Sequence, residues 1–404
     1  MHINQAVIVA GGLGTRLGDK SQNCPKPLQL IDGIPFLDYL IWNLKRYGIN
    51  NIILSIGFLG HKISSRYKNG GNFGVNIEYI TENSPAGTGG ALLLCKDKLN
   101  DFFFFLNGDT IFDINFHALG MELLSNEALG VLGLNYITNA KRYGSVEVEK
   151  NMVVSFKEKG GSENCYINGG ILALRKSVIN YIKQIPSSLE NDLFPVLVEK
   201  KLLRAKKFKN FFIDIGVPSS LMEAQILMPK WKKKSAVFID RDGVLNVDYG
   251  YVHDKKNFKF IDGAINAIKR LNELGFLVIV VTNQAGIGRG FYTEKQFNQF
   301  MEWINGVLKE KGAHIDDWYY CPHHPTEGKG EYRKLCDCRK PKSGLLELAI
   351  NNWQLDKKRI IMVGDKDSDI EAGNNLNINS YKYDSNSESL ETFFNKLPLE
   401  MLLG

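Results

Sequence analysis

The sequence predicts an α/β protein with two domains, and three observations support this prediction. A chain of 404 residues, 44% of them hydrophobic, is long enough for two or three domains with cores of their own. Short apolar runs alternate with stretches of helical periodicity, a pattern typical of parallel sheets covered by helices. A glycine-rich motif at 10–18 and an acidic motif at 237–246 each accompany such an apolar run.

The first domain is expected to span residues 1–229. The segment PFLDYLIWNLKRYG at 35–48 has the spacing of a helix between two predicted strands. The expected strands are 6–10, 52–56, 102–106 and 211–215. Because repeated strand–helix units place their strands side by side in one direction, we expect a largely parallel sheet with helices on both faces.

The second domain is expected to span residues 236–404, after a solvated linker at 230–235 that contains the basic run WKKKS. The segment GAINAIKRLNELG at 263–275 has the period of a crossover helix that ends at Gly275. The tail beyond about 385 reads as a closing helix. The expected strands are 236–240, 277–282 and 360–364.

Composition and charge indicate which classes of partner to expect. A formal net charge of +6, with 23% charged residues, suits anionic phosphorylated substrates. The chain has no long basic tract with interleaved aromatic residues, so we expect no nucleic acid partner. It has no signal-peptide pattern and no apolar run long enough to cross a membrane, so we expect a cytoplasmic protein without membrane association. The oligomeric state is left open.

The acidic motif points to phosphoryl transfer. The apolar run at 236–239 delivers Asp240 and Asp242 at its C-terminal end, where open α/β sheets bind ligands. Asp240 can attack phosphorus while Asp242 serves as general acid/base, with Mg²⁺ offsetting the repulsion between anions. The letters D-x-D-G also occur in turns and in calcium loops.

Residues further along the chain favour the phosphoryl-transfer interpretation. A second buried strand ends at Thr282, whose hydroxyl can hold a phosphoryl oxygen, and a third ends at Asp365. Arg339, Lys340 and Lys342 precede the third strand, and a lysine there can neutralise the phosphoryl group. The ordered set resembles the haloacid dehalogenase (HAD) superfamily of phosphatases, which implies a Rossmannoid fold for this domain.

A loop at 321–338 carries a cluster of metal-binding residue types. CPHHP at 321–325 and CDC at 336–338 hold three of the six cysteines of the chain. We expect Cys321, His323, Cys336 and Cys338 to bind a structural Zn²⁺, because four protein ligands close a tetrahedral site. A disulfide and unpaired thiols are the alternatives, and His324 is the weaker ligand choice that can face substrate instead. Outside this loop, Cys24, Cys95 and Cys165 read as incidental or buried thiols.

FIDRDGVLN, TNQAGIGRG and CDCRKPKSG together resemble the D-glycero-D-manno-heptose 1,7-bisphosphate 7-phosphatases, relatives of histidinol phosphatase. The resemblance implies Mg²⁺ at Asp240, Asp242 and Asp365, with Asp242 using its backbone carbonyl. It implies that Thr282 and Lys340 steady the phosphoryl group, although Lys342 is an alternative to Lys340. The substrate contacts that it implies are Arg339, Asn283, Gln284 and the segment Asp248–Tyr251, with Asp248 and Tyr251 named individually; a plain loop is the alternative for that segment.

The N-terminal motif reads as a phosphate-binding loop. A buried strand at 6–10 runs into GGLGTR, whose glycines let backbone N–H groups approach phosphates. The motif followed by Pro25-Lys26-Pro27 resembles the sugar-1-phosphate nucleotidyltransferases, which implies a Rossmann-like, GT-A-like fold. The resemblance implies that Arg16 and Lys26 are catalytic. It places Gly11, Gly12, Gly14 and Thr15 at the substrate.

Further segments match that family in order. PAGTGGAL at 85–92, with Gly87, Thr88 and Gly89, resembles the loop that approaches the nucleotide. Asp109 and Asp214 follow apolar runs and can meet at one Mg²⁺. Asn168, Gly169 and Lys157 match the sugar-binding side. Their alternatives are a hairpin turn for Asn168-Gly169 and an exposed charge for Lys157.

The segments at 81–92 and 106–115 most resemble the D-glycero-α-D-manno-heptose 1-phosphate guanylyltransferases, which implies GTP as the nucleotide. UTP, dTTP or CTP, and mannose or glucose, remain alternatives for the first half, as does a histidinol-phosphate-like substrate for the second. A non-enzymatic module in one half is a third alternative. The preferred hypothesis is a fusion in which the second half makes the heptose 1-phosphate that the first half consumes.

Overall fold

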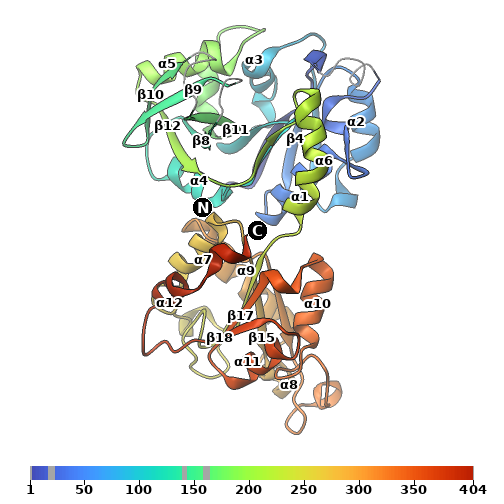
Figure 1. Ribbon diagram of the computed structural model, residues 1–404, viewed down its shortest axis with the longest axis vertical. Helices are drawn as coiled ribbons and strands as arrows, with labels where there is room; N and C mark the ends of the chain where they lie inside the picture. The colour runs from blue at the N-terminus through green and yellow to red at the C-terminus, as the bar shows by residue number, and fades with distance from the viewer. Residues whose placement is uncertain (1, 17–22, 139–142, 158–163, 404) are drawn as a thin grey trace. The chain divides into compact units, whose positions relative to one another are not determined.

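The computed structural model describes residues 2–16, 23–138, 143–157 and 164–403 (Figure 1). The chain forms two compact units, residues 1–231 and 232–404. Each unit is built around its own sheet, and each is described by itself below.

The large sheet of the first unit has nine strands and is mixed rather than largely parallel. Its order is β5-β4-β1-β6-β11-β8-β12-β10-β9. Strands β5, β4, β1 and β6 are mutually parallel, whereas β11 is antiparallel to both β6 and β8. The strands across the sheet are β5 (Asn76–Thr81), β4 (Asn51–Ile56), β1 (Gln5–Val9), β6 (Phe102–Asn107), β11 (Cys165–Arg175), β8 (Gly130–Ile137), β12 (Leu203–Phe208), β10 (Met152–Lys157) and β9 (Ser145–Glu149).

The segment expected as a strand at 211–215 lies outside this sheet. It forms β13 (Phe212–Asp214), which pairs with β7 (Thr110–Phe112) in a separate two-stranded ribbon. A second small ribbon pairs β2 (Leu30–Ile31) with β3 (Ile34–Pro35). The prediction of a strand was therefore right, but its place in the parallel sheet was wrong.

Helices cover both faces of the nine-stranded sheet, as Figure 1 shows. The predicted helix at 35–48 is α1 (Phe36–Arg46), which ends before Gly48 with its φ of 69°. One face packs against α1, α2 (Gly60–Tyr67), α4 (Phe116–Leu124) and α6 (Pro218–Lys232), and the other against α3 (Gly87–Leu94) and α5 (Phe194–Glu199).

Residues 230–235 do not form the solvated linker that we expected. Helix α6 continues to Lys232, and the Trp231 ring packs edge-on against Trp42 and stacks on Phe211, with centroids 5.6 and 5.5 Å away. Ser235 is 2% exposed and its hydroxyl donates to the Leu402 carbonyl at 2.5 Å. Trp231 and Ser235 therefore both have partners within the protein. The run of lysines between them suggested solvent exposure, so the sequence did not indicate these contacts.

The second unit has a five-stranded sheet in which every pairing is parallel. Its order is β16-β15-β14-β17-β18. Its strands are β14 (Ala236–Ile239), β15 (Leu277–Asn283), β16 (Asp317–Cys321), β17 (Ile360–Gly364) and β18 (Asn379–Lys382). One face packs against α7 (Ala264–Glu273), α9 (Glu294–Glu310) and α12 (Leu390–Lys396), and the other against α10 (Gly344–Trp353) and α11 (Asp367–Asn374).

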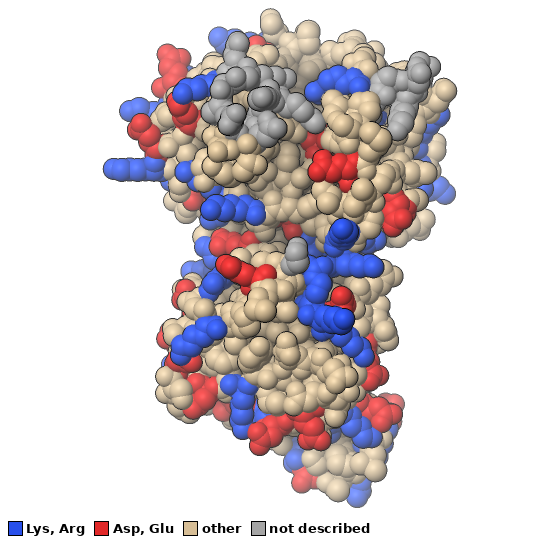
Figure 2. Space-filling view, viewed as in Figure 1, with Lys and Arg blue, Asp and Glu red and all other residues tan. Residues whose placement is uncertain are grey.

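The surface carries both basic and acidic side chains, as expected from a sequence with 50 Lys and Arg and 44 Asp and Glu residues. On the face drawn in Figure 2, basic and acidic side chains lie interspersed over each unit. Within the described part of the chain, no helix combines the length and the apolar character that crossing a bilayer requires.

Candidate active sites

Three predicted residues converge at the carboxyl edge of the second sheet. Asp240, Thr282 and Asp365 lie at the ends of β14, β15 and β17, which are neighbours in a parallel sheet. The Asp240 backbone N–H donates to the Val363 carbonyl at 3.0 Å, which anchors the end of β14 against β17. A cavity of about 510 Å³ opens here, and its lining includes Asp240, Asp242 and Thr282.

Three carboxylates crowd together beside this cavity. Oxygens of Asp240, Asp365 and Asp369 all lie within 4.8 Å of one another. Burial, and after it the charge of Asp240, raises the pKa of Asp365 to about 6. Oδ1 of Asp365 is buried and accepts no hydrogen bond from the described residues, whereas Oδ1 of Asp240 lies 2.9 Å from the Lys340 ammonium. Hard oxygen ligands that lack donors fit a divalent cation such as Mg²⁺.

Asp369 was not among our predicted residues. It lies in α11, one helical turn after Asp365, and is 1% exposed. Asp365 directly follows the strand and Asp369 lies in the first turn of the helix that follows, so the spacing D-x-x-x-D at a strand–helix junction could have identified it.

Lys340, and not Lys342, faces the carboxylates. Its ammonium lies 2.7 Å from Asp369 Oδ1 and 2.9 Å from Asp240 Oδ1, and it donates to the Val281 carbonyl at 2.7 Å. Burial lowers the pKa of Lys340, but Asp240 and Asp369 outweigh burial and raise it above the ordinary value. The Lys342 side chain is 55% exposed and pairs with Asp337. Geometry therefore favours Lys340 as the residue that meets a phosphoryl group.

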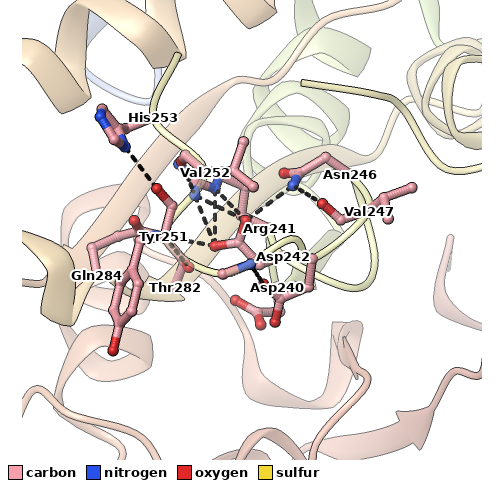
Figure 3. A network of polar contacts seen from close by, with 12 residues as sticks. Asp240, Arg241, Asp242, Asn246, Val247, Tyr251, Val252, His253, Thr282 and Gln284 are labelled. Carbon is pink, nitrogen blue, oxygen red and sulfur yellow. Dashed lines mark hydrogen bonds and ion pairs between the residues drawn. The ribbon is translucent and has the colours of Figure 1, made fainter. Parts of the chain in front are cut away.

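The Asp242 carboxylate is held by donors on several sides (Figure 3). Arg241 Nη2 lies 2.8 Å from both of its oxygens, Asn246 donates to Oδ1 at 2.9 Å and Gln284 to Oδ2 at 3.0 Å. Arg241 is fully buried and its guanidinium lies over the ring of Phe297 at 5.5 Å. The turn that follows requires glycine, because a Cβ at Gly243, with φ at 91°, would lie 2.3 Å from Asp365 Oδ2.

The side chains of the two residues after Thr282, Asn283 and Gln284, form hydrogen bonds with other protein groups of the site. Asn283 donates to the Lys340 carbonyl at 3.0 Å and accepts from the Lys340 N–H at 3.1 Å. Gln284 is 2% exposed and bonds to Asp242, Thr282 and Tyr292. Both residues line the cavity, yet these contacts fix their side-chain amides to neighbouring protein groups.

The predicted sugar-binding residues line the outer part of the same cavity. Asp248 accepts from the Gly250 N–H at 2.9 Å and from Lys366 at 3.1 Å. Burial raises the pKa of Asp248, but these two contacts outweigh it and leave the pKa below its ordinary value. Tyr251 is 41% exposed and lies under the Arg289 guanidinium at 5.4 Å. Arg339 and His324 also line the cavity.

The four predicted zinc ligands form one compact cluster. Cys321 Sγ lies 3.6 Å from Cys336 Sγ and 3.2 Å from Cys338 Sγ, and His323 Nδ1 lies 3.2 Å from Cys338 Sγ. Zn–S bonds of about 2.3 Å in a tetrahedron place sulfurs about 3.8 Å apart, so this donor set fits Zn²⁺ after small adjustments. His324 lies outside the cluster and accepts from the Glu327 N–H at 3.0 Å. The thiols are not joined by disulfides.

In the first unit, Lys26 and Asp109 meet at the carboxyl edge of the large sheet. The Lys26 ammonium donates to Asp109 Oδ2 at 2.7 Å. A pocket of about 210 Å³ is lined by both side chains, by Gly12 of the glycine-rich loop and by Thr88 of the second loop. Asp214 lies nearby, because the residue after it donates its N–H to the Asp109 carbonyl at 2.9 Å and Asp214 pairs with Thr110. The backbones of Asp109 and Asp214 are therefore neighbours, and carboxylates are ligands that Mg²⁺ prefers.

A glutamate that we did not predict lies between the two loops of this site. Glu82 accepts from the buried Ser55 hydroxyl at 2.8 Å and from the Ala86 N–H at 3.2 Å. A Cβ at Gly11 would lie 2.8 Å from Glu82 Oε1. In the second loop, a Cβ at Gly87, with φ at 74°, would lie 2.4 Å from the Ser187 carbonyl oxygen, and Gly89 donates its N–H to the same oxygen at 2.8 Å.

The remaining predicted residues of the first unit are less closely grouped. Asn168 lies inside β11, at an irregularity of its register, and accepts from the Gly170 N–H at 3.0 Å, so the hairpin-turn alternative is wrong. A Cβ at Gly169 would lie 2.3 Å from the Phe112 ring. Lys157 is 60% exposed and pairs with Glu147. Gly14, Thr15 and Arg16 end the described part of the glycine-rich loop, where Arg16 and Thr15 are exposed.

Comparison with known proteins agrees with two catalytic domains. The family model for nucleotidyl transferases matches residues 5–230, more than half of the chain, and the HAD-hydrolase-like model matches residues 337–393. The chain therefore belongs to the nucleotidyl transferase family and carries a HAD-like phosphatase domain in its second unit.

Two relatives of the second unit carry the same name. D-glycero-beta-D-manno-heptose-1,7-bisphosphate 7-phosphatase of Haemophilus influenzae is 55% identical over 138 residues, 34% of this chain and 74% of that protein. The protein of the same name from Escherichia coli K12 is 47% identical over 147 residues, 36% of this chain and 77% of that protein. The second unit belongs to the same family as these phosphatases.

The first unit is similar to a solved structure. HddC from Yersinia pseudotuberculosis, also solved in complex with GMP-PN, is 31% identical with a TM-score of 0.50. The match covers 56% of this chain and 100% of the HddC chain.

Proposed function

We propose that the second unit removes the 7-phosphate of D-glycero-D-manno-heptose 1,7-bisphosphate. The observation that carries this proposal is the buried group of Asp240, Lys340 and Asp369 beside a cavity rimmed by Arg339 and Tyr251. Half or more of the residues aligned with the Haemophilus influenzae phosphatase are identical, which supports the same substrate class.

The hydrolysis proceeds in two balanced steps. An Asp240 oxygen forms a bond to phosphorus while the bond from phosphorus to the sugar oxygen breaks, and that oxygen takes the proton of Asp242. Water then attacks the aspartyl phosphate and gives a proton to Asp242, which releases phosphate and restores Asp240. Lys340 and the Thr282 hydroxyl hold the phosphoryl oxygens. Asp240, Asp365 and the Asp242 carbonyl would hold Mg²⁺, which would supply further charge neutralisation.

We infer that the first unit transfers GMP from GTP to heptose 1-phosphate, with release of pyrophosphate. An oxygen of the sugar phosphate attacks the α-phosphorus, so positioning and charge neutralisation suffice and no covalent enzyme intermediate forms. Lys26, Arg16 and the loop of Gly11, Gly12, Gly14 and Thr15 hold the triphosphate. Mg²⁺ held by Asp109 and Asp214 supplies charge neutralisation there. The similarity to HddC, solved with a guanine nucleotide, supports GTP over other nucleotides.

The nucleotide and sugar contacts complete the proposal. Gly87, Thr88 and Gly89 bind the nucleoside, whereas Asn168, Gly169 and Lys157 bind the sugar. The two reactions are consecutive, because the phosphatase product is the transferase substrate. Both act on soluble metabolites, so we place the protein in the cytoplasm.

One incubation tests both halves. Purified full-length protein is mixed with heptose 1,7-bisphosphate, Mg²⁺ and each nucleoside triphosphate in turn, and phosphate, pyrophosphate and nucleotide sugars are followed by mass spectrometry. We expect phosphate in every tube and GDP-heptose with GTP alone. Phosphate without any nucleotide sugar would contradict the transferase assignment, and absence of both products would contradict the heptose assignment as a whole.

A further inference from the structure

One buried amide links two groups of the phosphatase site that lie on different elements. Gln284 Nε2 donates to Asp242 Oδ2 at 3.0 Å and to Thr282 Oγ1 at 2.9 Å, as the close view in Figure 3 illustrates. An amide nitrogen carries two hydrogens, so these two contacts use its whole donor capacity. Gln284 is 2% exposed, and no donor of its side chain is left for a substrate.

The orientation of this amide is set by a tyrosine. The Tyr292 hydroxyl donates to Gln284 Oε1 at 2.6 Å, and Tyr292 is 4% exposed. Burial raises the pKa of Tyr292 to about 12, so the hydroxyl keeps its hydrogen. The ring is confined as well, because it stacks on His253 at 4.6 Å and a Cβ at Gly286 would lie 2.5 Å from it. Because an ionised Asp242 carboxylate can only accept, the amide nitrogen faces Asp242, and the amide oxygen is left to accept from Tyr292.

The same chain of hydrogen bonds fixes the direction of the Thr282 hydroxyl. Since Oγ1 accepts from Gln284, its own hydrogen has to point elsewhere, and Thr282 lines the cavity. A hydroxyl that already accepts a hydrogen bond is also a better donor, because neighbouring hydrogen bonds polarise one another. The hydrogen is then available to an oxygen of the phosphoryl group.

We propose that Gln284 is a positioning residue, oriented by Tyr292, that holds the Asp242 carboxyl group for proton transfer and presents the Thr282 hydroxyl to the phosphoryl group. This inference rests on the proposed phosphatase function and deepens it. It replaces the substrate-binding role that the sequence suggested for Gln284 with an action through Asp242 and Thr282.

The leaving group of the substrate distinguishes positioning from a merely structural role. Phenyl phosphate needs a proton on its leaving oxygen, whereas 2,4-dinitrophenyl phosphate leaves as a stable anion without one. Neither ester contains the sugar, so sugar recognition does not enter the comparison. Misplacing Asp242 must therefore slow the first ester more than the second.

The experiment measures kcat and KM of full-length protein with both esters and with heptose 1,7-bisphosphate. Gln284→Glu is nearly isosteric but replaces the donor that faces Asp242 with an acceptor. Tyr292→Phe keeps the ring and removes only the hydroxyl that orients the amide. Asn305→Ala is the matched control, because Asn305 is also a buried amide of this unit but bonds to the backbone of Ile315.

We expect Gln284→Glu to lower kcat by about 100-fold with phenyl phosphate and the bisphosphate, and by less than about 10-fold with the dinitrophenyl ester. Tyr292→Phe should show the same pattern with smaller losses, and Asn305→Ala equal changes with all substrates. Equal losses on both esters in Gln284→Glu and Tyr292→Phe would overturn the positioning role while leaving the phosphatase assignment intact. Wild-type protein inactive on every ester would overturn both.

Discussion

At the scale of single residues, the phosphatase site depends on a buried ammonium that two carboxylates share. Lys340 is 3% exposed and lies between Asp240 and Asp369, whereas Lys342, two residues later, is exposed. The two lysines have the same charge and nearly the same place in the sequence. Because only their surroundings differ, a substitution of Lys342 is a suitable control for the same substitution of Lys340.

Replacement of Lys340 by methionine should abolish most of the phosphatase activity. Loss of one preorganised charge at a phosphoryl site costs about 100- to 1,000-fold in kcat, and the change also leaves Asp240 and Asp369 without their counter-charge. Lys342→Met should change kcat less than twofold. Phosphate release from the bisphosphate measures both variants, and nucleotidyl transfer by the first unit should be unchanged in each. A comparable loss in Lys342→Met would contradict this assignment.

A second lysine, in α9, predicts a pH-dependent stability. Burial lowers the pKa of Lys309 below its ordinary value of 10.5, with Asp316 acting in the opposite direction. The ammonium proton of Lys309 is therefore bound more tightly in the unfolded chain than in the folded one. The free energy of unfolding falls as the pH drops from 10.5 through the pKa of the folded state, and it rises again as the pH returns towards 10.5.

Lys309→Met should therefore stabilise the second unit by a few degrees at pH 7, with a gain that shrinks as the pH approaches 10.5. Calorimetry of the full-length protein across this range measures the effect. Lys311→Met, two residues later and beyond the end of α9, is the control. A gain that stays constant with pH would mean that the methionine acts by packing alone.

At the scale of elements, the loop at 321–338, which carries the cluster of three cysteines and His323, leads directly into the segment with Arg339 and Lys340. Cys321 ends β16, and Cys338 immediately precedes Arg339 and Lys340. A metal that ties these two cysteines together fixes the entry of the segment that carries both cations. The loop between them contains only one short helical turn, at Gly330–Tyr332, and few buried apolar residues, so it has little else to order it.

Removal of zinc should accordingly impair the phosphatase and spare the transferase. We expect about one zinc per chain by elemental analysis, lost in Cys336→Ser, together with a 10- to 100-fold drop in phosphatase kcat/KM, roughly as for other residues that orient a site from behind it. Cys165→Ser, a half-buried thiol outside the cluster, is the control. Full phosphatase activity in zinc-free protein with Mg²⁺ restored would contradict this prediction.

At the scale of the whole molecule, each of the two units carries a candidate site of its own. Asp240 lies in one compact unit and Asp109 in the other. Asp240→Asn should therefore abolish phosphate release and preserve nucleotidyl transfer to added heptose 1-phosphate. Asp109→Asn should do the reverse. Either variant losing both activities would contradict independent sites.

The proposed order of reactions makes a further prediction about stereochemistry. Hydrolysis at C7 leaves the configuration at C1 unchanged, so both units must prefer the same anomer if one feeds the other. We expect the anomer of heptose 1,7-bisphosphate that is hydrolysed faster to be, as the 1-phosphate, the faster transferase substrate. Rates with the synthetic α and β compounds measure this. If the two units preferred opposite anomers, the product of the phosphatase could not be the main substrate of the transferase, and the proposed order of reactions would be wrong.

The sequence alone predicted what depends on local order along the chain. Strands β1, β6, β14, β15 and β17 and helices α1 and α7 follow from apolar periodicity, because these patterns reflect the face that each element buries. Asp240, Thr282 and Asp365 follow from their places at strand ends. The four members of the cysteine–histidine cluster follow from ligand spacing, since two close pairs of residues need only one loop closure to meet.

Only the tertiary structure decided what depends on contacts between distant segments. The carboxylates of Asp240 and Asp369 contact Lys340 and not Lys342, and the Gln284 side chain accepts a hydrogen bond from buried Tyr292. Glu82 bonds to Ser55 of β4 and to Ala86, the large sheet is mixed, and Trp231 is packed where a linker was expected. Burial and hydrogen-bond partners are properties of the folded chain, and residue types and spacing do not specify them before the elements pack together.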